Sequence, residues 1–220
     1  MSSSVFDRLS ERYDAWFDTP RGSAILTAEV ACLRRLMPRD TSGWVELGVG
    51  TGRFAAALGI DEGVDPSSAM LQKAAARGIR TIAAEAEDLP YDSRSLQGIL
   101  LVVTLCFLTE PALALREFVR VLKEDGKLLV GIVPADSPWG EYYRLKGSQG
   151  HPFYSVARFY TCDEVTEMAV SAGFQLLGAA STLPMAPDEP LDDIPVLDGV
   201  AARCGFVGML FGPGSAEPAP

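Results

Sequence analysis

The chain has 220 residues, of which 48% are apolar and 22% charged, a composition typical of a folded, soluble protein. Its 19 Lys and Arg stand against 29 Asp and Glu, and the net charge of −10 argues against a surface that binds nucleic-acid phosphates. The longest strongly apolar stretch, residues 99–108, has ten residues, about half of what a membrane span needs. With charges near the N-terminus in place of a secretory signal, we expect a cytoplasmic location. Four scattered cysteines and a single histidine predict no metal site.

The pattern of apolar residues predicts helices and strands that alternate along the chain. Helical spacing indicates two helices within 5–37, interrupted at Pro20-Arg21-Gly22. Strands are predicted at 44–47, 60–64, 79–83, 98–105, 127–133, 174–182 and 204–211, and further helices at 53–58, 67–77, 112–122 and 162–172. This alternation favours an α/β doubly wound, mostly parallel sheet with helices on both faces.

The sequence predicts a single domain with four parts, followed by a tail. We predict one domain over 1–212, with an N-terminal helical lid at 1–38, a core at 40–133, an aromatic-rich insertion at 134–160 and the last part of the sheet at 161–212. The loop at 184–198 is long and rich in Pro and Asp. The tail at 213–220 has nothing to bury and is expected to be disordered.

A glycine loop follows the first predicted strand of the sheet. Gly48, Gly50 and Gly52 permit a tight turn and a close approach of the backbone to a nucleotide-like ligand. Residues 50–55 also match a dinucleotide pattern, with Asp65 as the ribose-binding acid. Glu46 stands two positions before the first glycine, where it would repel a pyrophosphate and suit a ligand with a positive charge. A turn without ligand remains a further interpretation.

Acidic residues follow three successive predicted strands. Glu46 and Asp65 are the first two, and Glu85, Glu87 and Asp88 form the third group. Together they fit an adenosyl group with a cationic tail. Asp65 is also compatible with a cap on the helix that follows it, and the third group with solvated surface charges.

Three segments resemble one family. They are Glu46-x-Gly48-x-Gly50-x-Gly52, Val64-Asp65-Pro66-Ser67-x-x-Met70-Leu71 and Ala86-Glu87-Asp88-Leu89-Pro90-Tyr91. Together they resemble the class I S-adenosylmethionine-dependent methyltransferases, in the small-molecule branch with a type 11 domain. Gly-Val-Gly-Thr-Gly-Arg-Phe-Ala, Thr-x-Cys-Phe and Val-Gly-Ile-Val are similar to a group of bacterial methyltransferases. The resemblance implies a Rossmann-like, seven-stranded sheet whose last strand is antiparallel.

The resemblance also implies roles for individual residues. Glu46 and the glycine loop would hold the methionine part of S-adenosylmethionine, Asp65 the ribose hydroxyls, and Glu85 the adenine amino group. The implied cofactor-binding set is Glu46, Gly48, Val49, Gly50, Gly52, Asp65, Pro66, Met70, Glu85, Ala86, Glu87 and Thr104. The product would be S-adenosylhomocysteine.

The acceptor side is less well defined. Tyr13-Asp14-x-Trp16-Phe17 resembles lid segments of this branch, and the candidates for a substrate lid are Tyr13, Trp16, Phe17, Trp139, Tyr142, Tyr143 and Phe153. The same aromatics are compatible with a static cover of the sheet. No catalytic base is assigned, since Cys106 stands where many relatives have histidine and is readily a small buried residue, and His151 is a weak candidate.

These expectations combine into a hypothesis about the reaction. We expect methyl transfer from S-adenosylmethionine to a small molecule by in-line attack, with positioning and exclusion of water as the main sources of acceleration. An NAD(P)-binding oxidoreductase and a catalytically silent adenosyl-binding regulator are the alternatives. The protein is expected to be a monomer or a homodimer without nucleic-acid partners.

Overall fold

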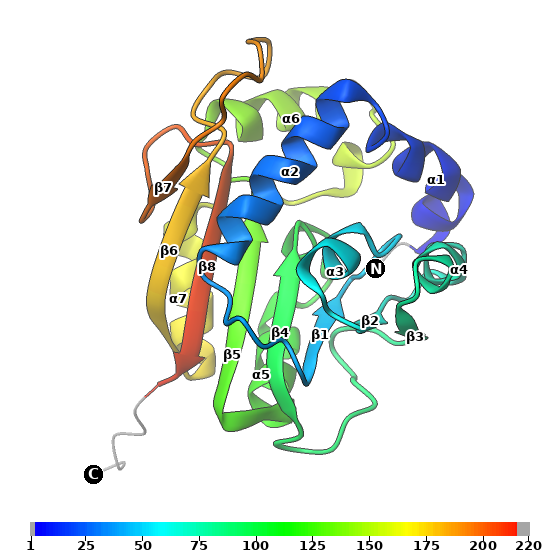
Figure 1. Cartoon of the computed structure of the whole chain (residues 1–220), viewed down its shortest axis with the longest axis vertical. Coiled ribbons are helices and arrows are strands. Elements are labelled where there is room, and N and C mark those ends of the chain that lie inside the picture. Colours follow the sequence, from blue (N-terminus) through cyan, green and yellow to red (C-terminus); the bar gives the residue numbers. More distant parts are fainter. Residues whose placement is uncertain (1–2, 215–220) are drawn as a thin grey trace.

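The computed structural model describes residues 3–214, and its helices and strands alternate as the sequence predicts (Figure 1). The helices are α1 (Ser3–Trp16), α2 (Pro20–Arg34), α3 (Arg53–Leu58), α4 (Ser68–Ala76), α5 (Pro111–Val121), α6 (Pro138–Ser148) and α7 (Cys162–Ala172), with short 3-10 turns η1 (Leu105–Phe107) and η2 (Tyr154–Val156). The strands are β1 (Trp44–Leu47), β2 (Glu62–Val64), β3 (Arg80–Ile82), β4 (Leu96–Val102), β5 (Leu122–Ile132), β6 (Phe174–Thr182), β7 (Val196–Asp198) and β8 (Phe206–Pro213).

All strands belong to one twisted sheet in the order β3-β2-β1-β4-β5-β8-β6-β7. The five strands from β3 to β5 are parallel, whereas β8 is antiparallel to both β5 and β6. The α/β doubly wound fold with an antiparallel last strand is therefore confirmed. β1 and β4 are neighbours although β2 and β3 lie between them in the chain. This reversal of strand order is the place where ligands bind in open parallel sheets.

The predicted number of seven strands is wrong, because β7 adds an eighth strand at the edge of the sheet. It pairs antiparallel with β6, and two hydroxyls of β6 hold its ends: Ser181 Oγ donates to Gly199 O at 2.5 Å and Thr182 Oγ1 to Pro195 O at 2.8 Å. These partners are distant in sequence, so no local pattern predicts the strand.

The bounds of β4 and β5 differ from the predicted 98–105 and 127–133, and two further segments differ as well. α6 lies inside the insertion at 134–160, where Ser137 caps its first turn by accepting from the Gly140 amide at 3.0 Å. At the other end, Pro213 does not belong to a tail, since it closes β8 opposite Phe174. The rest of the predicted tail, 215–220, lies outside the described residues.

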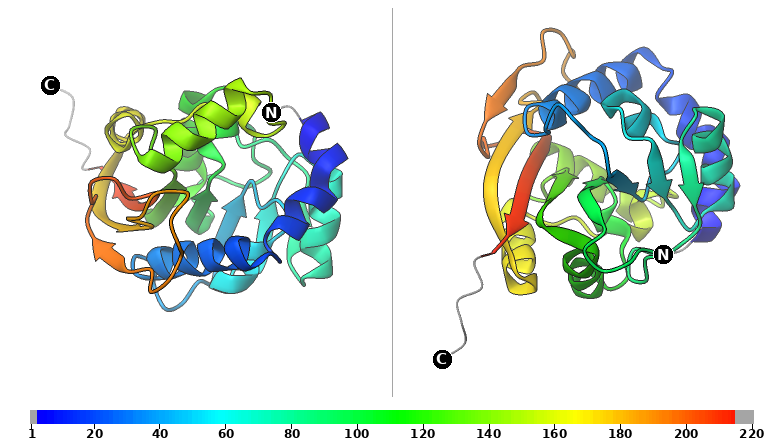
Figure 2. Two further views of the ribbon diagram at one scale, coloured as in Figure 1. Left: turned by 90° about the horizontal axis from the view of Figure 1, so that it is seen from above. Right: turned by 60° about the horizontal axis from the view of Figure 1, so that its bottom comes forward.

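Helices cover both faces of the sheet (Figure 2), and a layer of apolar side chains lies on each side of it. Ile99 and Leu101 of β4 point to the layer covered by α5 and α7, and Leu100 and Val102 point to the layer covered by α2, α3 and α4. All four side chains are buried, so β4 is apolar throughout, as expected of a strand covered on both faces. Each buried side chain of this size stabilises the fold by about 1.5–3 kcal/mol.

Helix caps fix where the flanking helices begin. Thr19 caps α2 ahead of Pro20, and Ser67 caps α4 by accepting from the Met70 amide at 3.3 Å. Thr161 and Glu164 form a reciprocal capping box at the start of α7. No helix within residues 3–214 is long and apolar enough to cross a membrane.

Candidate cofactor and acceptor site

The glycine loop between β1 and α3 has a backbone that side chains would obstruct. Gly48, Gly50 and Gly52 have φ values of +67°, +51° and +79°, in the left-handed region that favours glycine. A Cβ at Gly48 would lie 2.3 Å from Thr104 Cγ2, and one at Gly52 would lie 3.0 Å from Ala74 Cα. A Cβ at Gly50 would meet nothing closer than Tyr13 Cε1 at 3.8 Å. Gly48 and Gly52 therefore serve close packing, whereas a Cβ at Gly50 would make only ordinary van der Waals contacts.

Asp65 joins the glycine loop to the start of α4. Its Oδ2 accepts from the Gly50 amide at 2.9 Å and its Oδ1 from the Ser67 amide at 2.8 Å. Burial raises the pKa of Asp65, these two hydrogen bonds oppose that rise, and the nearby Glu85 carboxylate adds to it. The cap of α4 is Ser67 and not Asp65. Each carboxylate oxygen of Asp65 keeps a second lone pair with which it can accept from a ligand hydroxyl.

Glu46 is a buried acid on β1 with one oxygen left over. Its side chain is 2% exposed, and its Oε2 has no hydrogen-bond partner among residues 3–214. Burial raises the pKa of Glu46 well above its ordinary value, although a hydrogen bond from the Ala55 backbone acts to lower it. An unpartnered buried carboxylate oxygen costs free energy. The arrangement suits a ligand that brings a cationic donor to this point.

A small cavity of about 40 Å³ lies between the glycine loop and α1. It is lined by Phe6, Tyr13, Gly48, Gly50, Asp65, Pro66, Ser67, Met70, Val102, Val103, Thr104 and Phe107. Six predicted cofactor residues thus share one cavity: Gly48, Gly50, Asp65, Pro66, Met70 and Thr104. Three others do not line it: Glu46 is buried on β1, Val49 packs against Gly63, and Gly52 packs against α4.

The acidic segment after β3 does not line this cavity. Glu85 lies close enough to Asp65 for its charge to act on that carboxyl. Ala86 is buried in the layer of α5 and α7. Glu87 Oε1 accepts from the Glu110 amide at 3.3 Å, at the start of α5. The predicted contact of these residues with adenine stays a prediction.

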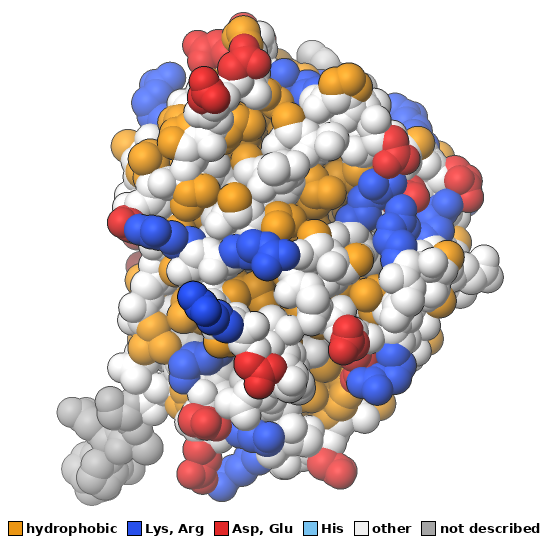
Figure 3. All heavy atoms as spheres, in the orientation of Figure 1, with side chains coloured by type: hydrophobic (Ala, Val, Ile, Leu, Met, Phe, Trp, Pro, Cys, Tyr) orange, Lys and Arg blue, Asp and Glu red, His pale blue; other side chains and the backbone are white. Residues whose placement is uncertain are grey.

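α1 is fastened over the glycine loop by three of its acids. Asp7 Oδ1 accepts from Ser67 Oγ at 2.5 Å, Glu11 pairs with Lys73 at 2.7 Å, and Asp14 pairs with Arg77 at 2.8 Å. All three partners belong to α4 or its cap, and Figure 3 shows basic and acidic side chains gathered over α1, α3 and α4. α1 is kinked at Leu9, so helical spacing places only Glu11 and Asp14, three positions apart, on one face. Asp7 lies before the kink and is directed to α4 by its own hydrogen bond to Ser67.

Asp14 is the most strongly bound of these acids. It accepts from Arg53 Nε at 2.8 Å as well as from Arg77 Nη2, and its side chain is 15% exposed. Burial alone would raise its pKa, but the hydrogen bonds from Arg53 and Arg77 lower the pKa of Asp14 to about 2. The carboxylate therefore stays charged throughout the physiological range and ties α1 to both α3 and α4.

The predicted lid aromatics fall into three groups. Tyr13 and Phe153 lie over the site with 5.7 Å between ring centroids, and Phe6, which the sequence analysis did not select, stacks on Phe153 at 5.3 Å. Phe17, Trp139 and Tyr143 pack into the layer of α2 and α6, where Trp139 Nε1 donates to Met185 O at 2.7 Å. Trp16 and Tyr142 are 38% and 37% exposed.

Neither weak candidate for a base lines the cavity. Cys106 Sγ donates to Val103 O at 3.4 Å, and burial raises the pKa of its thiol to about 12. The ring of His151 stacks on Tyr154 with 4.3 Å between centroids, and its Nδ1 has no partner among the described residues. Burial lowers the pKa of His151, and the charges of Arg12 and Lys146 lower it further.

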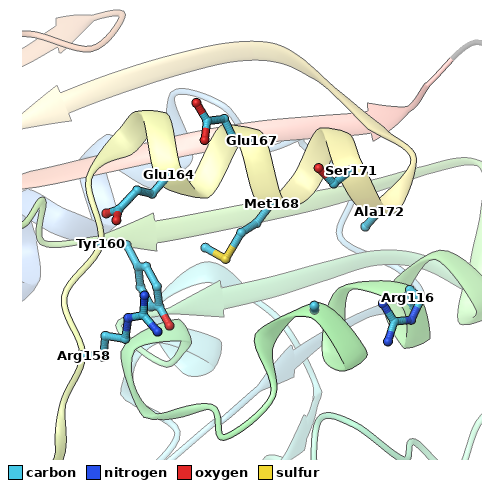
Figure 4. A pocket seen from close by; sticks show the side chains of 9 residues that line it. Arg116, Arg158, Tyr160, Glu164, Glu167, Met168, Ser171 and Ala172 are labelled. Carbon is cyan, nitrogen blue, oxygen red and sulfur yellow. The ribbon is translucent and has the colours of Figure 1, made fainter.

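A second, larger cavity lies on the other face of the sheet, between α5 and α7 (Figure 4). Arg116 comes from α5, Glu164 and Glu167 come from α7, and Arg158 lies over the Tyr160 ring, 4.9 Å from its centroid. It contains none of the predicted site residues and none of the unpartnered buried polar atoms found within residues 3–214. We therefore place the site at the glycine loop.

Some lining residues carry no sequence signal. Val103 has φ +45°, a strained conformation for a β-branched residue that is tolerated mainly at functional sites. Its amide donates to Gly131 O at 2.8 Å, so the neighbouring strand holds it in place. Phe6 and Phe107 had a readable apolar character, but only the fold brings their rings together, at 5.0 Å between centroids.

Comparison with known proteins identifies the family of the chain. Residues 45–130 match the methyltransferase domain family. An uncharacterised protein of Mycobacterium tuberculosis is 39% identical over 99% of this chain and 76% of its own length, and one of Methanocaldococcus jannaschii is 37% identical over 94% and 97%. A crystal structure from Thermotoga maritima, described as an S-adenosylmethionine-dependent methyltransferase and possible histamine N-methyltransferase, is 35% identical over 95% of this chain and 98% of its own, with a TM-score of 0.88. The chain belongs to the class I S-adenosylmethionine-dependent methyltransferases.

Proposed function

We propose that the protein transfers a methyl group from S-adenosylmethionine to a small-molecule acceptor, which attacks the methyl carbon in line with the leaving sulfur. One observation carries the cofactor side of this proposal. The unpartnered Glu46 Oε2 and the Asp65 carboxylate flank a glycine loop whose Gly50 lines the cavity. This arrangement is suited to a ligand that has both a cationic group and hydroxyls.

The residues fit the parts of the cofactor in turn. Glu46, with its orphaned buried oxygen, would accept from the positively charged amino group. Asp65 would accept from the ribose hydroxyls, and Pro66 and Met70 supply apolar lining beside it. Glu85 and Glu87 are proposed for the adenine amino group on the ground of the resemblance.

When bound, S-adenosylmethionine supplies a methyl group on a positively charged sulfur, which is a good leaving group. Phe6, Tyr13 and Phe107 close the cavity and would exclude water from it. Thr104 Oγ1 lies 2.9 Å from Val102 O and 3.3 Å from Gly48 O, so its single hydroxyl proton is shared between the end of β4 and the glycine loop. The contribution of the chain is therefore positioning and exclusion of water.

No basic side chain lines the cavity, which contains Asp65 and Tyr13 as its titratable groups. We propose that transfer proceeds without a general base from these lining residues. The description of the Thermotoga maritima structure names histamine, a small amine, as its possible substrate, and this supports a small acceptor for the present chain.

A thermal-shift assay followed by a turnover screen tests the proposal. At 100 times their dissociation constants, S-adenosylmethionine and S-adenosylhomocysteine should stabilise the protein by about 2.7 kcal/mol, which raises Tm by roughly 5–10 °C for a domain of this size. NAD and NADP should leave Tm unchanged. Formation of S-adenosylhomocysteine with a pool of small metabolites would establish transfer. Binding without turnover on any acceptor would favour the silent regulator.

A further inference from the structure

The segment 83–95, which connects β3 to β4, is held by two side chains of α5. Arg120 Nε donates to Glu117 Oε2 at 2.7 Å, and Arg120 Nη2 donates to Glu117 Oε1 at 2.6 Å. Glu117 Oε1 also accepts from the Leu89 amide at 2.8 Å. The guanidinium donates further to Leu89 O at 3.1 Å and to Tyr91 O at 2.9 Å. We call Glu117 and Arg120 the α5 clamp, because together they bind both donor and acceptor groups of the segment's backbone.

The α5 clamp has a fixed geometry. A guanidinium that meets a carboxylate through two parallel hydrogen bonds holds one orientation, whereas the charge of a lysine sits at a point. The hydrogen bond from Arg120 keeps the pKa of Glu117 below its ordinary value, so the pair stays charged near neutral pH. Phe118 and Val121 of the same helix are fully buried and anchor α5 against the sheet. The clamp is therefore a rigid support for the segment.

Further contacts hold the same part of the segment. The side chains of Ala86 and Leu89 are buried in the layer of α5 and α7, and the Tyr91 hydroxyl donates to Glu62 of β2. Together with the clamp, they fix the chain from residue 86 to residue 91. A loop that is ordered before a ligand arrives does not add its ordering cost to the binding step.

The segment leaves the sheet beside the cofactor cavity. The Asp65 amide donates at 3.2 Å to the carbonyl of Ile82, the last residue of β3, and Asp65 lines the cavity. Glu85 follows Ile82 by three positions and Glu87 by five. In an adenosyl group the base is bonded directly to the ribose. A ligand that extends along the carboxyl ends of the strands, with its ribose at Asp65, therefore brings its base to the start of this segment.

We infer that Glu117 and Arg120 are positioning residues for adenine recognition, because they fix the backbone that presents Glu85 and Glu87 to the adenine amino group. The inference rests on the proposed cofactor binding and on the adenine contacts proposed with it. Neither clamp residue lines the cofactor cavity, so the pair acts through the segment and not by touching the ligand. Without the clamp, the segment would have to become ordered when adenine binds, and this cost would weaken the contact with the amino group.

Two ligands that differ at one position of the base test this inference. S-inosylhomocysteine carries an oxygen where S-adenosylhomocysteine carries the adenine amino group. Calorimetry gives the dissociation constant of each ligand, and we call the ratio of the two constants the base preference. We expect wild type to bind S-adenosylhomocysteine about 10-fold or more tightly than S-inosylhomocysteine, as expected for one hydrogen bond to a charged group.

Variants of the clamp should lose this base preference. Glu117→Ala removes the acceptor of the Leu89 amide, and Arg120→Met removes the donors to Leu89 O and Tyr91 O. Each should weaken S-adenosylhomocysteine binding about 10-fold, with little change for S-inosylhomocysteine, so that the base preference approaches one. Glu117→Gln keeps an acceptor for the Leu89 amide and should retain most of the preference. Circular dichroism checks the fold of each variant, and Arg120→Met decides alone if Glu117→Ala does not fold.

Two controls separate positioning from general destabilisation. Glu124→Ala breaks an exposed ion pair with Arg94 at 2.7 Å, close to the clamp because the Arg94 amide donates to Arg120 O, and it should bind both ligands as wild type does. Asp65→Ala should weaken both ligands alike, since they share the ribose. A wild-type base preference in the folded clamp variants, equal losses of affinity for both ligands, or a wild type that binds both ligands equally would overturn the inference. Absence of S-adenosylhomocysteine binding to wild type would instead refute the proposed function.

Discussion

Replacing Asp14 by Asn tests whether ionic contacts hold α1 over the glycine loop. The substitution keeps the shape of the side chain and removes the charge that pairs with Arg53 and Arg77 at 2.8 Å. A pKa of about 2 in place of the ordinary 3.8 corresponds to about 2 kcal/mol of stabilisation, since one pKa unit is about 1.4 kcal/mol. With 15% of the side chain exposed, solvent screening reduces this value only slightly. We expect Asp14→Asn to lower the free energy of unfolding by about 2 kcal/mol at pH 7.

The pH dependence gives the same prediction a second form. The folded-state pKa of Asp14 is depressed, so its contribution is present above pH 3.8 and is lost as the pH falls toward 2. The difference in stability between wild type and Asp14→Asn should therefore shrink steadily below pH 4. If α1 closes over the bound cofactor, loosening it should also weaken S-adenosylhomocysteine binding, by at most about 30-fold for 2 kcal/mol.

Urea unfolding followed by tryptophan fluorescence measures the stability, and calorimetry measures the affinity. Asp18→Asn is the matched control, because Asp18 forms one ion pair with Arg53 and is 69% exposed. It should cost less than about 1 kcal/mol. Equal losses in the two variants, or an Asp14→Asn protein as stable as wild type, would refute the view that these contacts fasten the helix.

Three further predictions concern Glu29, the glycine loop and Asp65. Burial raises the pKa of Glu29, in α2, from 4.5 to about 8, so the stability of the wild type should decline as the pH rises through that range. Glu29→Gln should become the more stable protein, by up to about 5 kcal/mol at pH 9. A stability difference between the two proteins that is the same at pH 5, 7 and 9 in urea unfolding would contradict this. Gly48→Ala brings a Cβ within 2.3 Å of Thr104 Cγ2, whereas the Cβ of Gly78→Ala, also at a positive φ, would meet nothing within 4 Å. Gly48→Ala should therefore lose more stability than the roughly 1 kcal/mol expected of Gly78→Ala. Equal losses in the two variants would exclude a clash. Asp65→Ala should weaken S-adenosylhomocysteine binding about 10-fold or more by calorimetry, and unchanged affinity in a folded variant would leave Asp65 a purely structural role.

Local patterns were sufficient for the parallel half of the sheet. The strand Trp44–Leu47 and the helices at Arg53–Leu58 and Cys162–Ala172 have the predicted bounds, because apolar runs, glycines and caps lie within each segment. β7 was missed because its pairing depends on hydroxyls of β6. α6 was missed because glycines and aromatics obscure its period, and its packing against η2 stabilises it.

The site shows a similar division. Glu46, Gly50 and Asp65 could be predicted because the glycine loop and the acids at the ends of successive strands are visible in the sequence. Phe6 reaches the cavity only through the position of α1, and Val103 has a positive φ and donates to Gly131 O of β5, so neither could be read from spacing.

Hydrogen exchange with and without S-adenosylhomocysteine tests the location of the cofactor site most directly. Added protection is expected in residues 6–17, 48–52 and 65–70, because the ligand would lie between the glycine loop and α1. Closure of the acceptor side would extend the protection into 138–160. Protection confined to 112–116 and 158–172, the walls of the cavity between α5 and α7, or an α1 whose exchange does not change, would contradict the account.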